Sequence, residues 1–259
     1  MNKILVLGAG RMGAWLIDSL CLDYEVAVYD KDLTKLKYLF NCQRLTKLDE
    51  IKAFEPDMTI NSVSLQLTVK VFEEVLPYLP ENCILSDITS VKTPVRDFYL
   101  SSNRRYVSTH PMFGPTFANV KELNGQSAII ITQSDEEGKK FFRNFYKQFG
   151  IQLYEYSFIE HDETIAYSLS IPFASTMAFA ACMKPQEAPG TTFKRHFDIA
   201  KGLLSEEDYL LSEILFSPYT YDQLDNISIK LSYLRSIVKE KDAEKLKVFL
   251  AELRDNISE

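Results

Sequence analysis

A histidine beside a rigid loop is the residue of this sequence best suited to acid–base chemistry. His110 ends the apolar stretch Tyr106 to Thr109 and is followed by Pro111-Met112-Phe113-Gly114-Pro115. Two prolines and a glycine in six residues predict an irregular, rigid loop at a strand end. A histidine held there can accept a substrate hydroxyl proton while a hydride leaves the neighbouring carbon. A purely structural histidine is the alternative.

Two hydroxyl groups and a lysine follow an earlier strand. Thr89, Ser90 and Lys92 come soon after the apolar stretch Cys83 to Asp87. Ser90 could donate a hydrogen bond to a substrate, and Lys92 could attract or orient an anion. Hydroxyl groups at this position also commonly cap the next helix, so that alternative stays open.

A glycine motif near the N-terminus predicts a dinucleotide site. It lies between the apolar strand Ile4 to Leu7 and a predicted helix, Arg11 to Leu20, and Asp30 ends the next strand. In such sites the glycines form a turn, admit the pyrophosphate and pack the helix on the sheet, while the acidic residue binds ribose hydroxyls. The predicted cofactor-binding residues are Gly8, Ala9, Gly10, Arg11, Met12, Gly13, Asp30, Ser62 and Val63.

The carboxylate of Asp30 favours NAD over NADP. It accepts hydrogen bonds from both ribose hydroxyls and repels a 2′-phosphate, although the neighbouring Lys31 weakens that repulsion. FAD is a rival cofactor because the motif serves both dinucleotides, and a glycine turn without any ligand is the remaining alternative.

The first part of the chain alternates short apolar runs with amphipathic ones. Predicted strands alternate with helices such as Leu67 to Leu79 and Asp135 to Phe149; the strands are Ile4 to Leu7, Glu25 to Tyr29, Met58 to Ser62, Cys83 to Asp87, Tyr106 to Thr109, Ala128 to Thr132 and Ile151 to Tyr156. This alternation predicts an α/β fold, a Rossmann-like, doubly wound, mostly parallel sheet with helices on both faces. We expect residues 1–157 to form this NAD-binding domain.

The remainder, residues 158–259, is predicted to be an all-helical substrate and dimerisation domain. Glu163 to Met183, Glu206 to Phe216, Asp222 to Lys239 and Asp242 to Ile257 are its predicted helices. The helix from Thr164 to Cys182 is apolar on most sides, so most of its surface must be buried. A partner subunit would bury it and predicts a homodimer, whereas a central helix in a monomeric bundle is the alternative.

Composition excludes several classes of protein. The chain has 259 residues, 46% of them hydrophobic, and a formal net charge of −7, which argues against a nucleic-acid partner. No apolar run approaches the roughly 20 residues that a membrane span needs, so no membrane partner is expected. Its four cysteines show no metal-ligand spacing and are predicted to be buried free thiols in a reducing cytoplasm; no metal is expected.

Three motifs together resemble the prephenate dehydrogenase family of tyrosine biosynthesis. They are Gly8 to Gly13, Asp87-Ile88-Thr89-Ser90-Val91-Lys92 and Thr109-His110-Pro111-Met112-Phe113-Gly114-Pro115. The pair His161-Asp162 and the stretch Ala200 to Leu215 extend the resemblance over nearly the whole chain. From the sequence alone, capping or structure is the favoured role of that pair.

The resemblance implies oxidative decarboxylation of prephenate to 4-hydroxyphenylpyruvate with NAD(P). It implies that His110 hydrogen-bonds the ring 4-hydroxyl group and assists its deprotonation, and that Ser90 contacts the same hydroxyl group. It also implies a nucleotide-binding domain followed by a helical domain that dimerises. A fused chorismate mutase segment or a C-terminal regulatory domain is not expected.

Two positions depart from the family pattern. Phe173 stands where many members have a second helix histidine, and Gly202 where an arginine commonly holds the ring carboxylate. Lys194, Arg195 and Lys201 are therefore predicted to bind substrate, with Lys92 or a partner subunit as further sources of charge. Solvated surface charges are the alternative reading of these three residues. Arogenate dehydrogenase and a non-catalytic NAD-binding regulatory protein remain competing functions.

Overall fold

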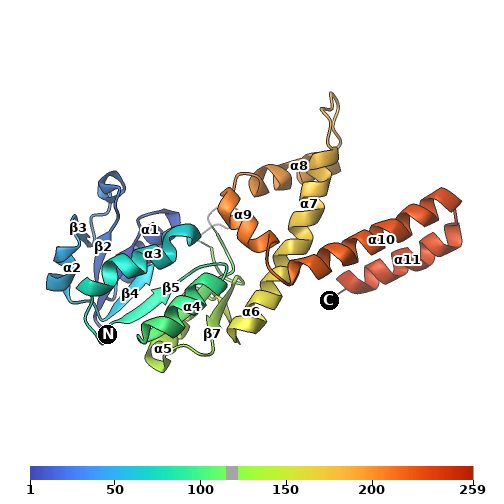
Figure 1. Ribbon diagram of the computed structural model, residues 1–259. Coiled ribbons are helices and arrows are strands. Elements are labelled where there is room, and N and C mark those ends of the chain that lie inside the picture. Colours follow the sequence, from blue (N-terminus) through green and yellow to red (C-terminus); the bar gives the residue numbers. More distant parts are fainter. Residues whose placement is uncertain (115–121, 259) are drawn as a thin grey trace. The chain divides into compact units, whose positions relative to one another are not determined.

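A mostly parallel sheet dominates the first part of the chain. The computed structural model describes residues 1–114 and 122–258. Within them, a sheet of eight strands has the order β3-β2-β1-β4-β5-β6-β7-β8 (Figure 1). The strands are β1 (Lys3–Leu7), β2 (Glu25–Tyr29), β3 (Gln43–Leu45), β4 (Met58–Asn61), β5 (Ile84–Asp87), β6 (Tyr106–Pro111), β7 (Ser127–Ile131) and β8 (Gln152–Tyr156). Of the described strand pairs, only β6 with β7 is antiparallel, so the predicted Rossmann-like fold is confirmed.

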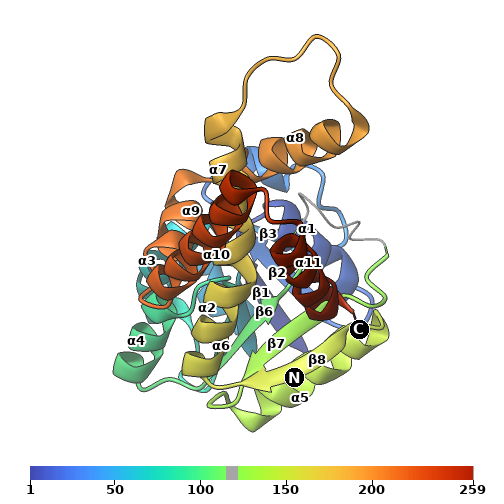
Figure 2. The same cartoon turned by 90° about the vertical axis from the view of Figure 1, so that its right-hand side faces the viewer.

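Helices cover both faces of this sheet because its strands are buried on both sides. Ile4 and Val6 of β1 point into a core shared with α1 (Arg11–Leu20) and α5 (Glu136–Gln148). Leu5 and Leu7 point into the opposite core, which includes side chains of α2 (Asp49–Phe54), α3 (Leu65–Val75) and α4 (Thr93–Ser102). Figure 2 shows α5 running along β8. Alternation along the strands therefore builds a layer of helices on each face.

The chain divides into two compact units. Unit 1 comprises Met1–Ile165 and Ser205–Glu213, and unit 2 comprises Ala166–Leu204 and Ile214–Glu259. These units differ from the division expected at residue 157, because α6 (Phe158–Ile165) and most of α9 (Asp208–Leu215) belong to unit 1.

Unit 2 is helical. A π-helical turn, Ala166–Ser170, leads into α7 (Ile171–Cys182), which is followed by α8 (Thr191–Leu203), α10 (Thr220–Glu240) and α11 (Ala243–Ile257). The last two helices form a hairpin in which the rings of Tyr233 and Phe249 meet at 5.4 Å (Figure 1). The buried hydroxyl groups of Ser170 and Thr220 hydrogen-bond at 2.7 Å and tie the π-helical turn to α10.

Two expectations need correction, one about buried cysteines and one about the length of apolar segments. Of the four cysteines, only Cys83 is buried, and Cys182 is exposed at the end of α7. The helix Phe158–Cys182 is, by length and composition alone, long and apolar enough to cross a membrane, contrary to the expectation that no apolar run approaches that length. Apolar and small polar residues alternate in this helix, so no single run of hydrophobic letters revealed it.

Candidate active site

The glycine loop after β1 has a backbone that only glycine accommodates at two positions. Gly8 has a φ of +94°, a conformation that side chains strongly disfavour. A Cβ atom on Gly13 would lie 2.1 Å from the Gly8 carbonyl oxygen, so helix α1 can approach the loop only without a side chain there. Gly10, in contrast, opens onto a cavity, and a Cβ atom there would meet no atom of the described residues within 4 Å beyond its own chain neighbours.

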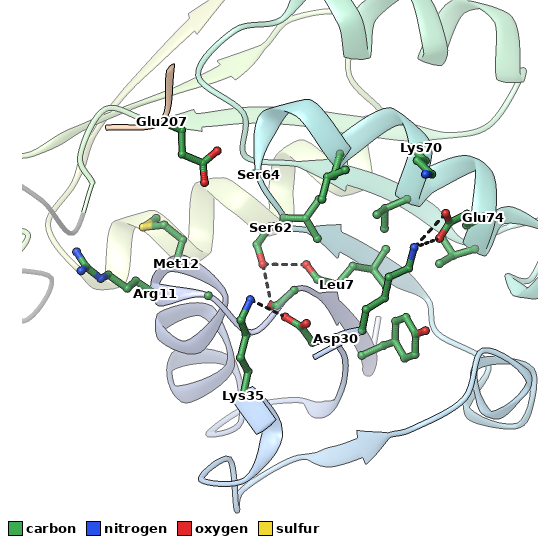
Figure 3. Close-up of a pocket in the computed structure, with 18 residues that line it drawn as sticks. Leu7, Arg11, Met12, Asp30, Lys35, Ser62, Ser64, Lys70, Glu74 and Glu207 are labelled. Carbon is green, nitrogen blue, oxygen red and sulfur yellow. Dashed lines mark hydrogen bonds and ion pairs between the residues drawn. The ribbon is translucent and has the colours of Figure 1, made fainter. Parts of the chain in front are cut away.

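This cavity has a volume of about 460 Å³ (Figure 3). Seven of the predicted cofactor residues line it: Gly8, Gly10, Arg11, Met12, Asp30, Ser62 and Val63. The other two act on the loop itself, because the backbone N–H of Ala9 donates to Asp30 Oδ2 at 2.8 Å and Gly13 packs on Gly8. Ser62 Oγ donates to the carbonyl oxygens of Leu7 and Gly8 at 2.9 and 3.0 Å, which fixes the turn.

Charged side chains surround Asp30 in the same cavity (Figure 3). Lys35 Nζ lies 3.8 Å from Asp30 Oδ2, and Lys31 forms an ion pair of 2.8 Å with Glu74 of α3. Lys31 is therefore already neutralised by Glu74, a partner that was not predicted from the sequence. Glu207, from the segment Ser205–Glu213, also lines the cavity and was not predicted. No spacing rule connects Glu74 or Glu207 to the glycine loop, so only the fold brings them there.

The parallel strands bring the predicted catalytic residues to the same sheet edge as this cavity. In the register, Asn61 of β4 lies opposite Asp87 of β5, and Asp87 lies opposite Ser108 of β6. The loops after β1, β2, β4 and β5 and the end of β6 therefore share the carboxyl edge, where open α/β sheets bind ligands. Ser90 is half-buried in the loop after β5.

His110 lies within a strand and not in the loop that follows it. Strand β6 continues to Pro111, and His110 pairs with Ile129 of the antiparallel β7. The next residues are held by Phe113, whose ring meets that of Trp15 at 5.6 Å. Pro115, the last residue of the predicted motif, lies outside the described residues. The rigidity expected from proline and glycine therefore comes largely from strand pairing.

The environment of His110 favours its neutral form. Its side chain is only 7% exposed, and its Nδ1 lies 3.0 Å from Nε2 of His161. Burial, the neighbouring His161 ring and the Lys92 ammonium group together hold the pKa of His110 well below its usual value of 6.5. At neutral pH this histidine is therefore an unprotonated imidazole that can accept a proton.

Lys92 is placed differently from the sequence expectation of an anion-binding lysine. It is fully buried, and its Nζ donates to Asp87 Oδ2 at 2.6 Å and to the Thr109 carbonyl oxygen at 2.8 Å. Burial opposes the charge of Asp87, but Lys92 and the hydroxyl group of Thr89 outweigh it and lower the Asp87 pKa. Lys92 thus braces the residue before His110 and does not offer its charge to an exposed anion.

His161 and Asp162 belong to the site, although the sequence favoured a capping or structural role. His161 is completely buried and bridges His110 and Asp162, with its Nδ1 2.9 Å from Asp162 Oδ1. Burial lowers the pKa of His161, and the hydrogen bond that its ring donates to Asp162 offsets this only in part. A histidine followed directly by an aspartate at a helix start was the signal that could have found them. Within residues 1–114 and 122–258, no group of three or more His, Cys, Asp and Glu side chains converges as a metal site.

The three basic residues predicted to bind the substrate lie in unit 2. Lys194, Arg195 and Lys201 are exposed side chains of α8. Phe173 is a half-buried residue of α7.

The family profile "Prephenate dehydrogenase, nucleotide-binding domain" matches residues 20–153, which is just over half of the chain. The chain belongs to the prephenate dehydrogenase family. The match covers the nucleotide-binding domain of that family.

Relatives in sequence are distant and longer than this chain. The T-protein of Enterobacter agglomerans is 29% identical over 179 residues, 68% of this chain and 43% of that protein. A probable arogenate/prephenate dehydrogenase of Methanocaldococcus jannaschii is 23% identical over 93% of this chain and 57% of that protein. The chain thus spans about half the length of the curated family members it matches.

Solved structures of family members share the whole fold. Prephenate dehydrogenase from A. aeolicus, in complex with hydroxyphenyl propionate and NAD+, has a TM-score of 0.84 at 20% identity and covers 99% of this chain and 97% of that one. Synechocystis arogenate dehydrogenase has a TM-score of 0.76 at 16% identity over 98% of both chains. At these identities the structural similarity demonstrates a common fold.

Proposed function

We propose that this family member is an NAD-dependent enzyme that oxidatively decarboxylates prephenate to 4-hydroxyphenylpyruvate. The observation that carries the proposal is His110, a neutral histidine fixed by strand pairing on the sheet edge that also bears the glycine loop. The family relatives named for prephenate and arogenate dehydrogenases support the same chemistry.

The residues around the cavity fit a dinucleotide. Gly10 leaves open space beside the start of α1, where free backbone N–H groups favour a pyrophosphate. Asp30 supplies a carboxylate for ribose hydroxyl groups, and Ser62 and Val63 close the side of the cavity after β4. When bound, NAD supplies the hydride acceptor of the reaction. The A. aeolicus structure that holds NAD+ supports this cofactor.

The chain itself has to position the substrate and remove one proton. His110 accepts the proton of the ring hydroxyl group as the carbonyl forms, and Ser90 orients that hydroxyl group. Loss of the ring carboxylate creates an aromatic ring, so most of the driving force lies in the substrate. A non-catalytic NAD-binding protein would not require a neutral, braced histidine at this edge.

The substrate carries two carboxylates, and cations of α8 are proposed to bind one of them. Replacing Arg195 or Lys194 with alanine should raise the substrate KM at least about tenfold, because an unpaired desolvated carboxylate costs several kcal/mol. Affinity for NAD should hardly change. Lys201→Ala completes the series, and steady-state kinetics of the three variants measures the effect. Unchanged KM values in all three would assign the carboxylate to backbone N–H groups or to a partner subunit.

Cofactor preference provides a test that needs no turnover. Asp30→Ser should improve NADP affinity relative to NAD by about tenfold or more, since like charges about 4 Å apart near a protein surface repel by about 4 kcal/mol before screening. Calorimetric titration with both dinucleotides measures this ratio. Asp23→Ser is the matched control, because it removes an exposed carboxylate that is not among the residues lining the cavity. Tighter binding of NADP than NAD by the unmodified protein would refute the role of Asp30.

We further propose a homodimer through the helical part, and helix α7 supports it. It is strongly apolar, yet it buries none of its residues within the chain. A two-fold pairing with a second copy is the commonest way to cover such a face. Light scattering without detergent should give twice the chain mass of 29.8 kDa at micromolar concentration. A single species of 29.8 kDa, or material that stays soluble only in detergent, would contradict the dimer.

Activity is the direct test of the proposal. Purified protein should reduce NAD when prephenate is added, followed by NADH absorbance, with arogenate assayed in parallel. Turnover of arogenate alone would assign the amino analogue as substrate, and turnover of neither would favour a binding protein. We expect a cytoplasmic enzyme with free thiols.

A further inference from the structure

The imidazole of His110 is the inner end of a hydrogen-bonded chain within unit 1. His110 Nδ1 lies 3.0 Å from His161 Nε2, and His161 Nδ1 lies 2.9 Å from Asp162 Oδ1. The second carboxylate oxygen of Asp162, Oδ2, accepts a hydrogen bond from the hydroxyl group of Thr93 at 3.0 Å. The chain therefore connects β6 to α6 and to the first residue of α4.

The chemistry of each group determines where the hydrogens lie. An aspartate at neutral pH only accepts hydrogen bonds, so Nδ1 of His161 carries a hydrogen and donates it to Asp162. A neutral His161 ring then has its lone pair on Nε2, which accepts a hydrogen bond from Nδ1 of His110. His110 consequently has its own lone pair on Nε2, on the side of the ring away from His161.

Solvent exposure increases along the hydrogen-bonded chain from His161 to Thr93. The side chain of His161 is 0% exposed, that of Asp162 is 15% exposed, and Thr93 is an exposed residue. The negative charge thus sits at the solvent end and the two neutral rings lie inside. A small anion from solvent can reach the position of Asp162 more easily than the histidines.

Two further charges act on the histidines from β5 and the loop after it. The Lys92 ammonium group disfavours a positive charge on either ring, and Asp87 favours one on His161. A proton taken up by His110 is therefore held at a site that resists positive charge. Among the described residues, His161 is the one within hydrogen-bond distance of His110 Nδ1, and Asp162 is the one whose carboxylate contacts the His161 ring.

We propose that His161 and Asp162 are positioning residues that set the tautomer of His110 and stabilise its charged form during the reaction. The inference rests on the proposed role of His110 as proton acceptor. As the substrate proton arrives at His110 Nε2, the Nδ1 proton passes to His161 Nε2, and the resulting imidazolium is paired with Asp162. After product release His110 loses its Nε2 proton to water and the Nδ1 proton returns, so the chain is restored with no net change.

The tautomer can be tested without any turnover. The sequence has three histidines, so selective ¹⁵N labelling gives few ring signals, and His110→Asn and His196→Gln assign them. His110 should carry its hydrogen on Nδ1 in the unmodified protein. In Asp162→Asn the amide can donate to His161 Nδ1, which should reverse both rings and place the His110 hydrogen on Nε2. A hydrogen on His110 Nε2 in the unmodified protein would overturn the proposal.

The kinetics of Asp162→Ala test the second part of the proposal, the stabilisation of the charged form of His110. The kcat should fall at least about 100-fold, within the range for losing the orienting carboxylate of a catalytic histidine. The KM of the substrate should stay within about threefold of that of the unmodified protein. Added formate should raise the kcat of the variant at least tenfold, whereas chloride at equal ionic strength should not. Asp97→Ala, which removes an exposed carboxylate of α4, is the matched control.

The outcomes separate this proposal from the proposed function. A kcat of Asp162→Ala within threefold of the unmodified protein, or a loss that formate does not restore, would overturn the charge-stabilising role. If the unmodified protein turns over neither prephenate nor arogenate, the proposed function fails, while the ¹⁵N spectra still decide the tautomer.

Discussion

Replacing His110 with asparagine should lower the turnover of prephenate by roughly two to four orders of magnitude, the usual contribution of a positioned general base. Asparagine keeps a hydrogen-bonding side chain of similar size but cannot accept the proton of the ring hydroxyl group. Binding of NAD should stay nearly intact, because His110 is not among the residues that line the nucleotide cavity. Stopped-flow or steady-state measurement of NADH formation gives the ratio.

The pH dependence of the unmodified protein should agree with the environment of His110. Because burial and the neighbouring positive charge lower its pKa, His110 stays neutral until the pH falls well below 6.5. Turnover should therefore be level around neutrality and decline only on the acidic side of an ordinary histidine titration. A variant His110→Asn that keeps near-normal turnover would assign proton acceptance elsewhere, with His161 the next candidate.

Breaking the buried ion pair should have the largest effect on stability. Lys92→Met should lower the free energy of unfolding by about 3–5 kcal/mol, because Asp87 would keep its charge in the core without its partner. Tyr99 and Thr89, which donate to the same carboxylate at 2.9 and 2.7 Å, can compensate only in part. Urea titration followed by circular dichroism measures the change.

Two further variants separate the loss of a lysine side chain as such from the loss of the partner of the buried Asp87 charge. Lys140→Met removes an exposed lysine of α5 and should change stability by less than about 0.5 kcal/mol. The double variant Asp87→Asn with Lys92→Met should recover part of the loss, since no isolated charge remains. A loss below about 1 kcal/mol in Lys92→Met would show that Lys92 does not brace this part of the sheet.

The pair of Asp87 and Lys92 should also make the folded chain less stable at acidic pH. The pKa of Asp87 is lower in the folded chain than in the unfolded one, so protonation favours unfolding. Its contribution is fully present above the unfolded value of about 3.9 and is lost as the pH falls through the lower, folded value. In Asp87→Asn this part of the acid sensitivity should disappear.

Periodicity alone predicted the elements with strong apolar patterns. Helix α1 and strand β2 begin and end at the predicted residues, and the order of strands and helices through β8 follows the alternation of apolar runs. Strand β3 was not predicted because its three residues, Gln43–Leu45, include two exposed polar side chains. Helix α4 was missed because Pro94 and two serines obscure its apolar face, Val95 and Phe98.

The site was only partly predictable because its chemistry depends on contacts between distant residues. The glycine loop and Asp30 follow a local spacing rule, and their placement in one cavity matches it. The contact of His110 with His161 joins positions 51 residues apart. Nothing local indicated that Lys92 would turn inward to Asp87, because a lysine after a strand is usually solvated.

The most direct test of the account is the stoichiometry of the reaction with prephenate. Protein incubated with NAD and prephenate should release NADH and CO₂ in equal amounts and form 4-hydroxyphenylpyruvate, and His110→Asn should abolish nearly all of both products. Absence of NADH from prephenate, under conditions where calorimetry shows that NAD binds, would contradict the proposed enzyme.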